Sequence, residues 1–173
     1  MNKTALLNYA LTARRDLESQ IALSLNKLGI YEGAIKKANL VGEYTVIEGT
    51  EETFPKRVFA LRDPIIERVK DDGFKNVVEE LAYTWFNRII ALRFMEVHDY
   101  FDHGLRVLTS RDGSFEPEIL RNVDFVIDDL GMNREVVDSL KAKSSNEELY
   151  RYILFSQCNS LSKRRSIPFS KMG

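Results

Sequence analysis

The two histidines are the side chains of this sequence with the clearest capacity for metal or acid–base chemistry. His98 is followed directly by Asp99, and a His-Asp dipeptide supplies two metal ligands in some phosphohydrolases. Such a site needs more histidines, and the only other one in the chain is His103. A separation of five residues is poor for sharing one face of a helix. We therefore interpret the two histidines as polar groups near a helix end at Gly104.

Other reactive side chains also favour structural roles. Cys158 is the only cysteine, which excludes an internal disulfide and a zinc site built from cysteines. Its helical spacing with Leu154 and Leu161 predicts a buried structural thiol rather than a nucleophile. Arg93 and Glu96 are three residues apart, so we expect an ion pair in the structure or in an interface rather than a catalytic site.

Three common catalytic or nucleotide-binding motifs are absent from the sequence. No two glycines are spaced as Gly-x-Gly, which excludes a dinucleotide-binding loop, and the glycine spacing also excludes a phosphate-binding loop. No Asp or Glu has a lysine two residues later, although nucleases of the common restriction type use this pair to hold metal and water. We therefore expect no catalytic residue, no cofactor-binding residue and no metal ligand in this chain.

Length and composition are those of one globular domain. The chain has 173 residues, of which 44% are hydrophobic and 29% are charged. Charges interrupt the longest apolar stretches, so we expect no membrane contact. The first residues lack the apolar core of a signal peptide, so we expect a cytoplasmic protein. The predicted boundaries are a single helical domain over residues 1–162 and a basic, disordered tail over residues 163–173.

Helices are the elements predicted to position these side chains. Apolar residues recur at helical spacing between positions 6 and 28, and Gly29 ends this first helix. The strongest segment covers residues 74–101 and has apolar groups on more than one face. We expect it to be a central helix packed from several sides, with Trp85 largely buried. Shorter helices are predicted over residues 56–71, 116–130, 133–142 and 146–161.

The region between the first two helices gives a weaker signal. Tyr44-Thr45-Val46-Ile47 has strand character but is only four residues long. Residues 30–54 are therefore interpreted as a loop or a short hairpin arm. The predicted fold class is all-α or mainly α, a multi-helix bundle around the long central helix with at most a short hairpin near residues 40–50.

One run in the central helix and the loop after it is distinctive. It reads Ala82-Tyr83-Thr84-Trp85-Phe86-Asn87-Arg88, then Ala91-Leu92-Arg93-Phe94-Met95-Glu96, then His98-Asp99-Tyr100, then His103-Gly104-Leu105-Arg106-Val107-Leu108. Two further segments accompany it, Tyr9-Ala10 with Ala13-Arg14 and Glu148-Leu149-Tyr150-Arg151-Tyr152-Ile153 with Gln157-Cys158-Asn159. Over residues 1–162 the sequence resembles the N-terminal region of adenine-specific DNA methyltransferases of BREX phage-defence systems, the PglX type.

The resemblance implies part of an enzyme rather than a whole one. Members of this family are far longer. Their S-adenosylmethionine loop has no counterpart here because no two glycines are spaced as Gly-x-Gly, and their Asn-Pro-Pro-Tyr motif has none because all four prolines are isolated. The resemblance therefore implies a non-catalytic N-terminal accessory domain, or a truncated fragment, that binds no cofactor itself. Its implied partners are the methyltransferase catalytic domain or other subunits of the defence system. The alternative is a stand-alone helical protein with an interaction or regulatory function.

A weak contact with the DNA backbone is the remaining functional prediction. Such contacts form largely between basic side chains of the protein and phosphate oxygens of the DNA. The candidates are Arg14 and Arg15 on the first helix, and Arg106 and Arg111 in the loop after the central helix. The middle of the sequence is acidic, so we expect only weak, salt-sensitive binding. The competing interpretation is that these arginines pair with nearby carboxylates.

Overall fold

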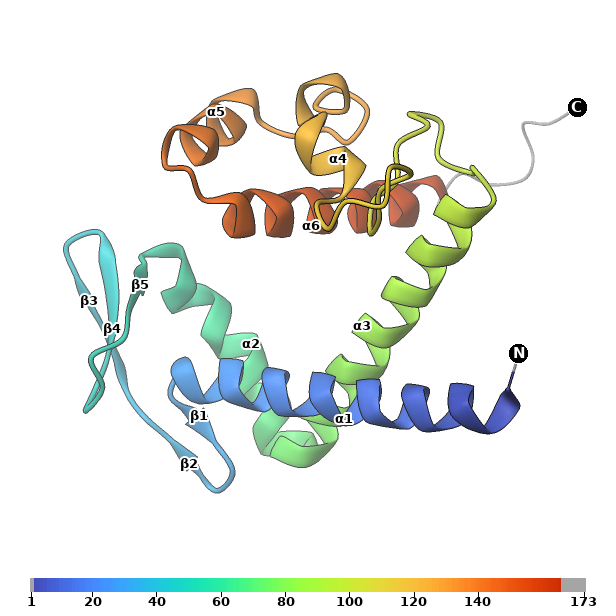
Figure 1. Cartoon of the computed structure of the whole chain (residues 1–173). Coiled ribbons are helices and arrows are strands. Elements are labelled where there is room, and N and C mark those ends of the chain that lie inside the picture. The colour runs from blue at the N-terminus through green and yellow to red at the C-terminus, as the bar shows by residue number, and fades with distance from the viewer. Residues whose placement is uncertain (1, 166–173) are drawn as a thin grey trace, which may run out of the picture. The chain divides into compact units, whose positions relative to one another are not determined.

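The computed structural model describes residues 2–165, and contacts between Cα atoms divide the chain into two compact units. Unit 1 is Met1–Asn87 and unit 2 is Arg88–Gly173. The elements, shown in Figure 1, are α1 (Lys3–Lys27), β1 (Ile30–Tyr31), β2 (Ala34–Ile35), β3 (Ala38–Val41), β4 (Tyr44–Ile47), β5 (Thr53–Pro55), α2 (Arg57–Asp72), α3 (Phe74–Val97), α4 (Glu118–Arg121), the 3-10 turn η1 (Val123–Phe125), α5 (Arg134–Ala142) and α6 (Asn146–Arg165). The boundary between the units falls within α3.

The predicted all-α or mainly α bundle with at most a short hairpin is wrong. The segment interpreted as a loop or hairpin arm forms five strands in two small antiparallel sheets. One sheet pairs β1 with β2, and the other has the order β3-β4-β5. Each strand is two to four residues long, which is too short for an alternating pattern to mark it. Within residues 2–165 the fold is mixed α/β.

The core of unit 1 forms where the end of α1 meets α2, the start of α3 and the short strands. Asn2 caps α1, because its side-chain oxygen accepts the N–H of Thr4 at 3.0 Å. Gly29 follows the helix with φ +74°, and a Cβ there would lie 2.6 Å from the side chain of Ile47. The buried apolar cluster comprises Leu25, Ile30, Val69, Val77 and Val78. The predicted first helix is confirmed, and a glycine is required at its end.

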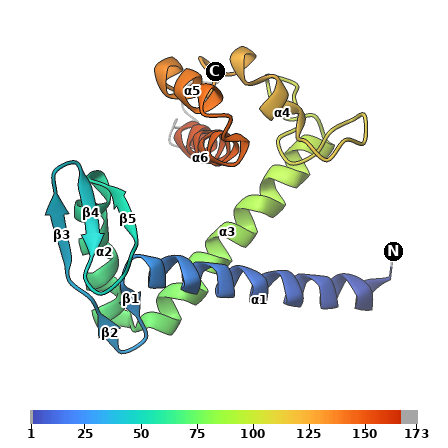
Figure 2. The ribbon, with the colours of Figure 1, turned by 60° about the vertical axis from the view of Figure 1, so that its left-hand side comes forward.

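A buried arginine joins α2 to the strands of unit 1. Arg62 is 4% exposed, and it donates hydrogen bonds from Nε to the carbonyl of Leu28 and from Nη2 to that of Lys36, both at 2.8 Å. Figures 1 and 2 show the β3-β4-β5 sheet beside α2, which contacts all three strands. Pro64 lies inside α2. Trp85 on α3 was expected to be largely buried, and the structure leaves it half-buried.

The core of unit 2 lies between α6 and the elements that precede it. Figures 1 and 2 show α4 and α5 along one side of α6, and both contact it. The buried cluster comprises Leu92, Phe101, Val107, Ile119, Val123, Val126, Ile127, Leu130, Met132, Val137, Leu149, Ile153 and Cys158. Asn133 caps α5, since its side-chain oxygen accepts the N–H of Glu135 at 2.8 Å.

The predicted helix over residues 116–130 is broken into α4, η1 and turns. The side-chain amide of Asn122 donates to the carbonyl of Glu118 at 2.8 Å, and such local bonds compete with helix propagation. At the other end of the unit α6 continues to Arg165, so residues 163–165 of the predicted tail are helical. Residues 166–173 lie outside the described part of the chain. The single domain over residues 1–162 stays a prediction.

No helix within residues 2–165 combines the length and the apolar character needed to cross a bilayer.

Candidate functional site

The C-terminal end of α3 has a specific backbone geometry. The N–H of Tyr100 donates to the carbonyl of Met95 at 2.9 Å, and that of Asp99 donates to the carbonyl of Glu96 at 3.5 Å. Asp99 has φ +52°, a left-handed conformation that Asp tolerates better than most residues. This arrangement is a Schellman-type helix end. It stops α3 at Val97, so Asp99 ends the helix earlier than the sequence predicts.

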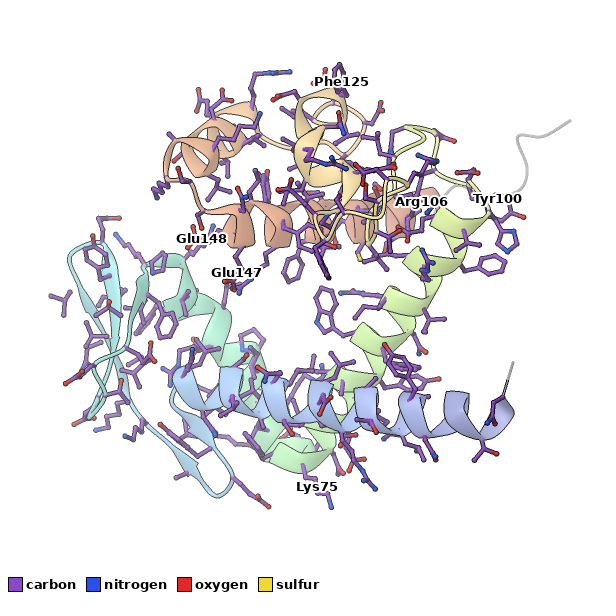
Figure 3. The ribbon with its side chains drawn as sticks, in the orientation of Figure 1. Lys75, Tyr100, Arg106, Phe125, Glu147 and Glu148 are labelled. Atoms are coloured by element: carbon purple, nitrogen blue, oxygen red, sulfur yellow. The ribbon has the colours of Figure 1, made fainter. Side chains whose placement is uncertain are left out.

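An aromatic cluster lies on the surface at this helix end. The centroid of the His98 ring lies 4.4 Å from that of Phe94 and 5.4 Å from that of Tyr100. The ring centroids of Phe94 and Tyr100 are 6.0 Å apart. All three residues are exposed. Figure 3 shows Tyr100 just beyond the end of α3, on the outside of unit 2.

The opposite face of α3 holds the following loop through a buried carboxylate. Glu96 is 1% exposed, and its Oε2 accepts the backbone N–H groups of Val107 at 2.9 Å and Leu108 at 2.8 Å. Its Oε1 accepts the hydroxyl of Thr109 at 2.9 Å and a hydrogen bond from Arg93. Burial alone would raise the pKa of Glu96, but these donors outweigh it and the pKa is lowered. The predicted pairing of Arg93 with Glu96 is confirmed.

Two further side chains fix the same loop. The hydroxyl of Tyr150 on α6 donates to the carbonyl of Val107 at 2.9 Å, and burial together with the nearby Glu96 raises the pKa of Tyr150 to about 12. Glu118 accepts the backbone N–H groups of Arg106 at 3.0 Å and Arg111 at 2.8 Å. These bonds lower the pKa of Glu118 against the opposing effect of burial. The loop therefore has its backbone groups tied to α3, α4 and α6.

Of the four arginines proposed for DNA contact, two lie in this loop of unit 2. Arg111 pairs with Asp99 and with Glu118, both at 2.7 Å, and it donates to the carbonyl of Gly104 at 3.0 Å. Arg106 is half-buried, and among the described residues its buried Nε has no hydrogen-bond partner. Figure 3 shows Arg106 on the loop that follows α3.

The other two arginines lie on α1, in unit 1. Arg14 forms an ion pair with Glu18 at 2.9 Å, one helical turn later. Arg15 is exposed. The structure thus brings the four candidates together only as two pairs. Three of the four have the nearby carboxylates of the competing interpretation, since Arg14 and Arg111 form ion pairs and the charge of Arg106 acts on Glu118.

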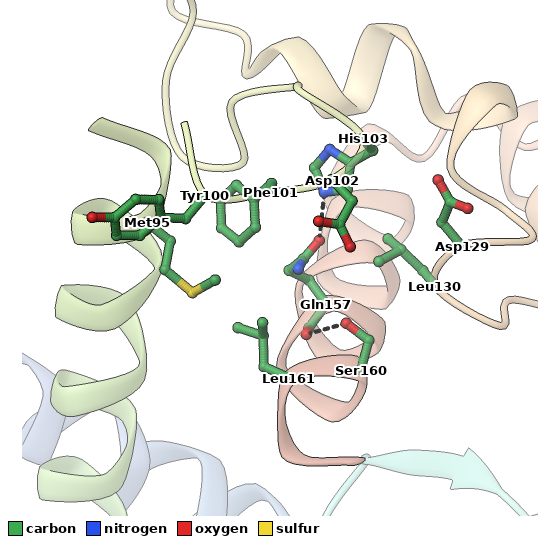
Figure 4. Close-up of a pocket in the computed structure, with 10 residues that line it drawn as sticks. All are labelled: Met95, Tyr100, Phe101, Asp102, His103, Asp129, Leu130, Gln157, Ser160 and Leu161. Carbon is green, nitrogen blue, oxygen red and sulfur yellow. Dashed lines mark hydrogen bonds between the residues drawn. The ribbon is translucent and has the colours of Figure 1, made fainter. Parts of the chain in front are cut away.

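A small pocket in unit 2 contains one of the two histidines (Figure 4). Its volume is about 90 Å³, and its lining includes Phe101, Asp102, His103, Asp129 and Gln157. The Nδ1 atom of His103 accepts the N–H of Leu105 at 3.1 Å, so its Nε2 carries the proton and donates to Gln157 at 3.0 Å. Both ring nitrogens of His103 are therefore used within the fold. The volume suits a few water molecules rather than a substrate.

The remaining candidates for chemistry have structural environments. Cys158 is buried, as predicted, and burial raises the pKa of its thiol, which weakens it as a nucleophile. Within residues 2–165 no group of three or more His, Cys, Asp or Glu side chains is placed to hold a metal ion. His98 lies in the aromatic cluster, whereas His103 lies in the pocket.

The aromatic cluster is the feature that sequence reasoning missed. The predicted helix over residues 74–101 includes Tyr100, and this helix was expected to be packed from several sides. The structure instead leaves one face of its C-terminal half exposed, including Ile90, Phe94 and Val97. The spacing of these three residues, four and then three apart, was a usable signal for a separate face.

Comparison with known proteins gives two informative matches, although no protein-family model matches the chain. The sequence is 34% identical over 176 residues to the adenine-specific methyltransferase BrxX of Escherichia coli O9:H4 (strain HS), covering 98% of this chain and 14% of that protein. It is 36% identical over 141 residues to the adenine-specific methyltransferase PglX of Lacticaseibacillus casei (strain Zhang), covering 76% of this chain and 12% of that protein. The chain thus spans a small part of the length of the relatives it matches.

Proposed function

We propose that this chain, a confirmed relative of the PglX-type adenine-specific methyltransferases, serves as a non-catalytic accessory module of such an enzyme in a BREX-type defence system. The observation that carries the proposal is the alignment over 98% of this chain with only 14% of a methyltransferase. S-adenosylmethionine binding and methyl transfer to adenine then belong to polypeptide outside this chain. The chain would then be located in the cytoplasm, because the enzyme to which it belongs acts on DNA there.

The polar groups at the end of α3 support a role without catalysis. The carboxylates of Glu96 and Glu118 accept hydrogen bonds from backbone N–H groups of the loop, and Arg111 forms ion pairs with two carboxylates. A general base or a nucleophile must itself lie within reach of a substrate. These side chains instead give the loop and helix end a fixed shape. A fixed, partly apolar surface suits a scaffold or a contact with a partner protein.

Co-purification tests the scaffold role. The chain would be co-expressed with the catalytic methyltransferase polypeptide of the same organism, and a stable complex is expected in size-exclusion chromatography. Calorimetry on the chain alone is expected to detect no binding of S-adenosylmethionine. Micromolar binding of that cofactor by the chain alone would contradict the non-catalytic role. Absence of a complex would favour the alternative, a stand-alone interaction or regulatory protein.

We also propose a secondary role in DNA contact for Arg15, which is exposed, and for Arg106, whose charge is already shared with Glu118, because it helps to lower the pKa of that carboxyl. Two such positions in different units support only weak, non-specific binding, with a dissociation constant in the range of about 10⁻⁴–10⁻⁶ M. The test is duplex binding at 50 and 200 mM salt, which spans a range of roughly 10³-fold loss for proteins with many phosphate contacts. Tight, sequence-selective binding that persists at the higher salt would contradict this expectation.

A further inference from the structure

We infer that one exposed face of α3 is the surface that docks against the methyltransferase polypeptide, where it occupies an apolar groove. The face consists of Ile90, Phe94 and Val97 on the helix together with His98 and Tyr100 at its end, and we call it the α3 patch. The inference rests on the proposed function and names the part of the chain that makes the contact.

The first argument is the position of the α3 patch on the helix. Ile90, Phe94 and Val97 are 53%, 55% and 50% exposed, and their spacing places them on one face. Leu92 and Glu96 on the opposite face are buried in unit 2. Single exposed apolar residues are common on protein surfaces, whereas a contiguous group marks an interaction site more often. The C-terminal half of α3 therefore exposes apolar side chains on the face opposite to the one that it buries.

The second argument is that the α3 patch is held in one arrangement before any partner binds. The rings of Phe94, His98 and Tyr100 contact one another, and the Schellman-type turn fixes where Tyr100 leaves the helix. Asp99 within that turn is bound to Arg111 at 2.7 Å. A surface that is already ordered loses less conformational entropy on binding, and aromatic side chains are frequent anchors in interfaces.

The third argument concerns the chemistry of the occupant. Apolar residues at positions i, i+4 and i+7 are the pattern by which a helix enters an apolar groove of a partner protein. The cations beside the α3 patch are already neutralised, because Arg93 is paired with Glu96 and Arg111 with Asp99 and Glu118. A DNA phosphate would therefore gain little electrostatic attraction from Arg93 and Arg111 at the α3 patch. Most of the length of the related methyltransferases lies outside this chain, and that polypeptide supplies a partner of the required size.

Affinity measurements on matched variants test the inference. The methyltransferase polypeptide would be titrated against the wild-type chain, Phe94→Ala, Tyr100→Ala and the control Phe125→Ala. Phe125 also belongs to unit 2 and is 80% exposed, but it lies in η1, and Figure 3 shows it away from Tyr100. We expect Phe94→Ala and Tyr100→Ala each to weaken binding by about 10-fold or more, as removal of an interface anchor does. Phe125→Ala is expected to bind within about twofold of the wild type, because near-neutral surface positions change affinity little.

The outcomes separate this inference from the proposed function. If the wild-type chain binds and the three variants bind equally well, the α3 patch is not the docking surface, while the accessory role stands. If Phe94→Ala and Tyr100→Ala lower the thermal midpoint of the chain without weakening binding, the α3 patch is packed within the chain and the inference is overturned. If the wild-type chain does not bind, the proposed function fails and the inference falls with it. Tyr100 lies beyond the helix, so its variant reports on docking even where Phe94→Ala does not fold.

Discussion

The two units bury charges of opposite sign and use them for the same purpose. In unit 1 the guanidinium of Arg62 donates to the backbone carbonyls of Leu28 and Lys36. In unit 2 the carboxylate of Glu96 accepts from the backbone N–H groups of Val107 and Leu108. Among the described residues these are the two charged side chains that are buried, with 4% and 1% exposure. Each fixes irregular backbone to a long helix.

The difference in sign follows from the backbone groups that each segment leaves unpaired. The turn after α1 and the strand connection present carbonyls, which need a donor, whereas the loop after α3 presents N–H groups, which need an acceptor. A carbonyl has two lone pairs and tolerates incomplete pairing better than a buried N–H, which has one hydrogen to give. The carboxylate in unit 2 should therefore matter more to stability than the guanidinium in unit 1.

The largest expected effect is the loss of Glu96. Replacement by Ala leaves the buried N–H groups of Val107 and Leu108 without a partner, and each costs about 1–3 kcal/mol. We expect Glu96→Ala to lower the free energy of unfolding by about 2–6 kcal/mol, measured by urea denaturation. The control is Glu116→Ala, because the distance from Glu116 to Arg121 is 3.9 Å and their side chains are 41% and 39% exposed. A loss below about 1 kcal/mol, the upper end for an exposed ion pair, would contradict the anchoring role.

A smaller loss is expected for the counterpart in unit 1. Arg62→Met keeps much of the aliphatic stem and removes the two donors, so the carbonyls of Leu28 and Lys36 lose these bonds. We expect a loss of about 1–3 kcal/mol, with Arg57→Met on the exposed surface of the same helix as the control. If Arg62→Met lowers the free energy of unfolding more than Glu96→Ala does under the same urea protocol, unpaired N–H groups do not cost more stability than unpaired carbonyls in this protein.

The third prediction distinguishes the two anchors by pH. The pKa of Glu96 is lowered from 4.5 in the folded chain, so its stabilisation is complete above the unfolded-state value and is lost as the pH falls through the folded-state value. The stability gap between the wild type and Glu96→Gln should therefore shrink as the pH is lowered from 7 to 3. The gap for Arg62→Met should stay constant, because arginine keeps its charge over this range. Urea midpoints at each pH provide the measurement, and a Glu96→Gln gap that widens towards acid would show the opposite linkage.

Helix ends set by local bonds were predictable from the sequence. The bond of Asn2 to Thr4 and that of Asn133 to Glu135 join residues two apart, and α5 begins within one residue of the start predicted for the helix over residues 133–142. The strands were not predictable in the same way. They are short, and Arg62 bonds Leu28 before β1 and Lys36 between β2 and β3, across 34 and 26 residues of sequence. No local sequence pattern in residues 30–54 indicates that Arg62 will donate hydrogen bonds to this region.

The candidate site divides along the same line. The pairing of Arg93 with Glu96 was readable from their spacing, but the bonds of Glu96 to the loop span 11 to 13 residues. The aromatic cluster depends on the turn at Asp99, because this turn brings Tyr100 beside Phe94. A left-handed residue that is not glycine gives little warning in a sequence, so the helix was expected to continue past it.

The smallest expected effect concerns this turn and tests whether exposed ion pairs contribute to unit 2 as the buried anchor does. Asp99→Asn removes the ion pair with Arg111, whose partners are 46% and 67% exposed, and it keeps a residue type that tolerates the left-handed conformation. Solvent screens such a pair, so we expect a loss of about 0–1 kcal/mol in urea denaturation. Asp99→Val serves as the contrast, because a β-branched residue in this conformation adds a backbone cost of roughly 1–2 kcal/mol. A loss for Asp99→Asn close to that of Glu96→Ala would mean that the surface pair, rather than the buried carboxylate, holds the end of α3.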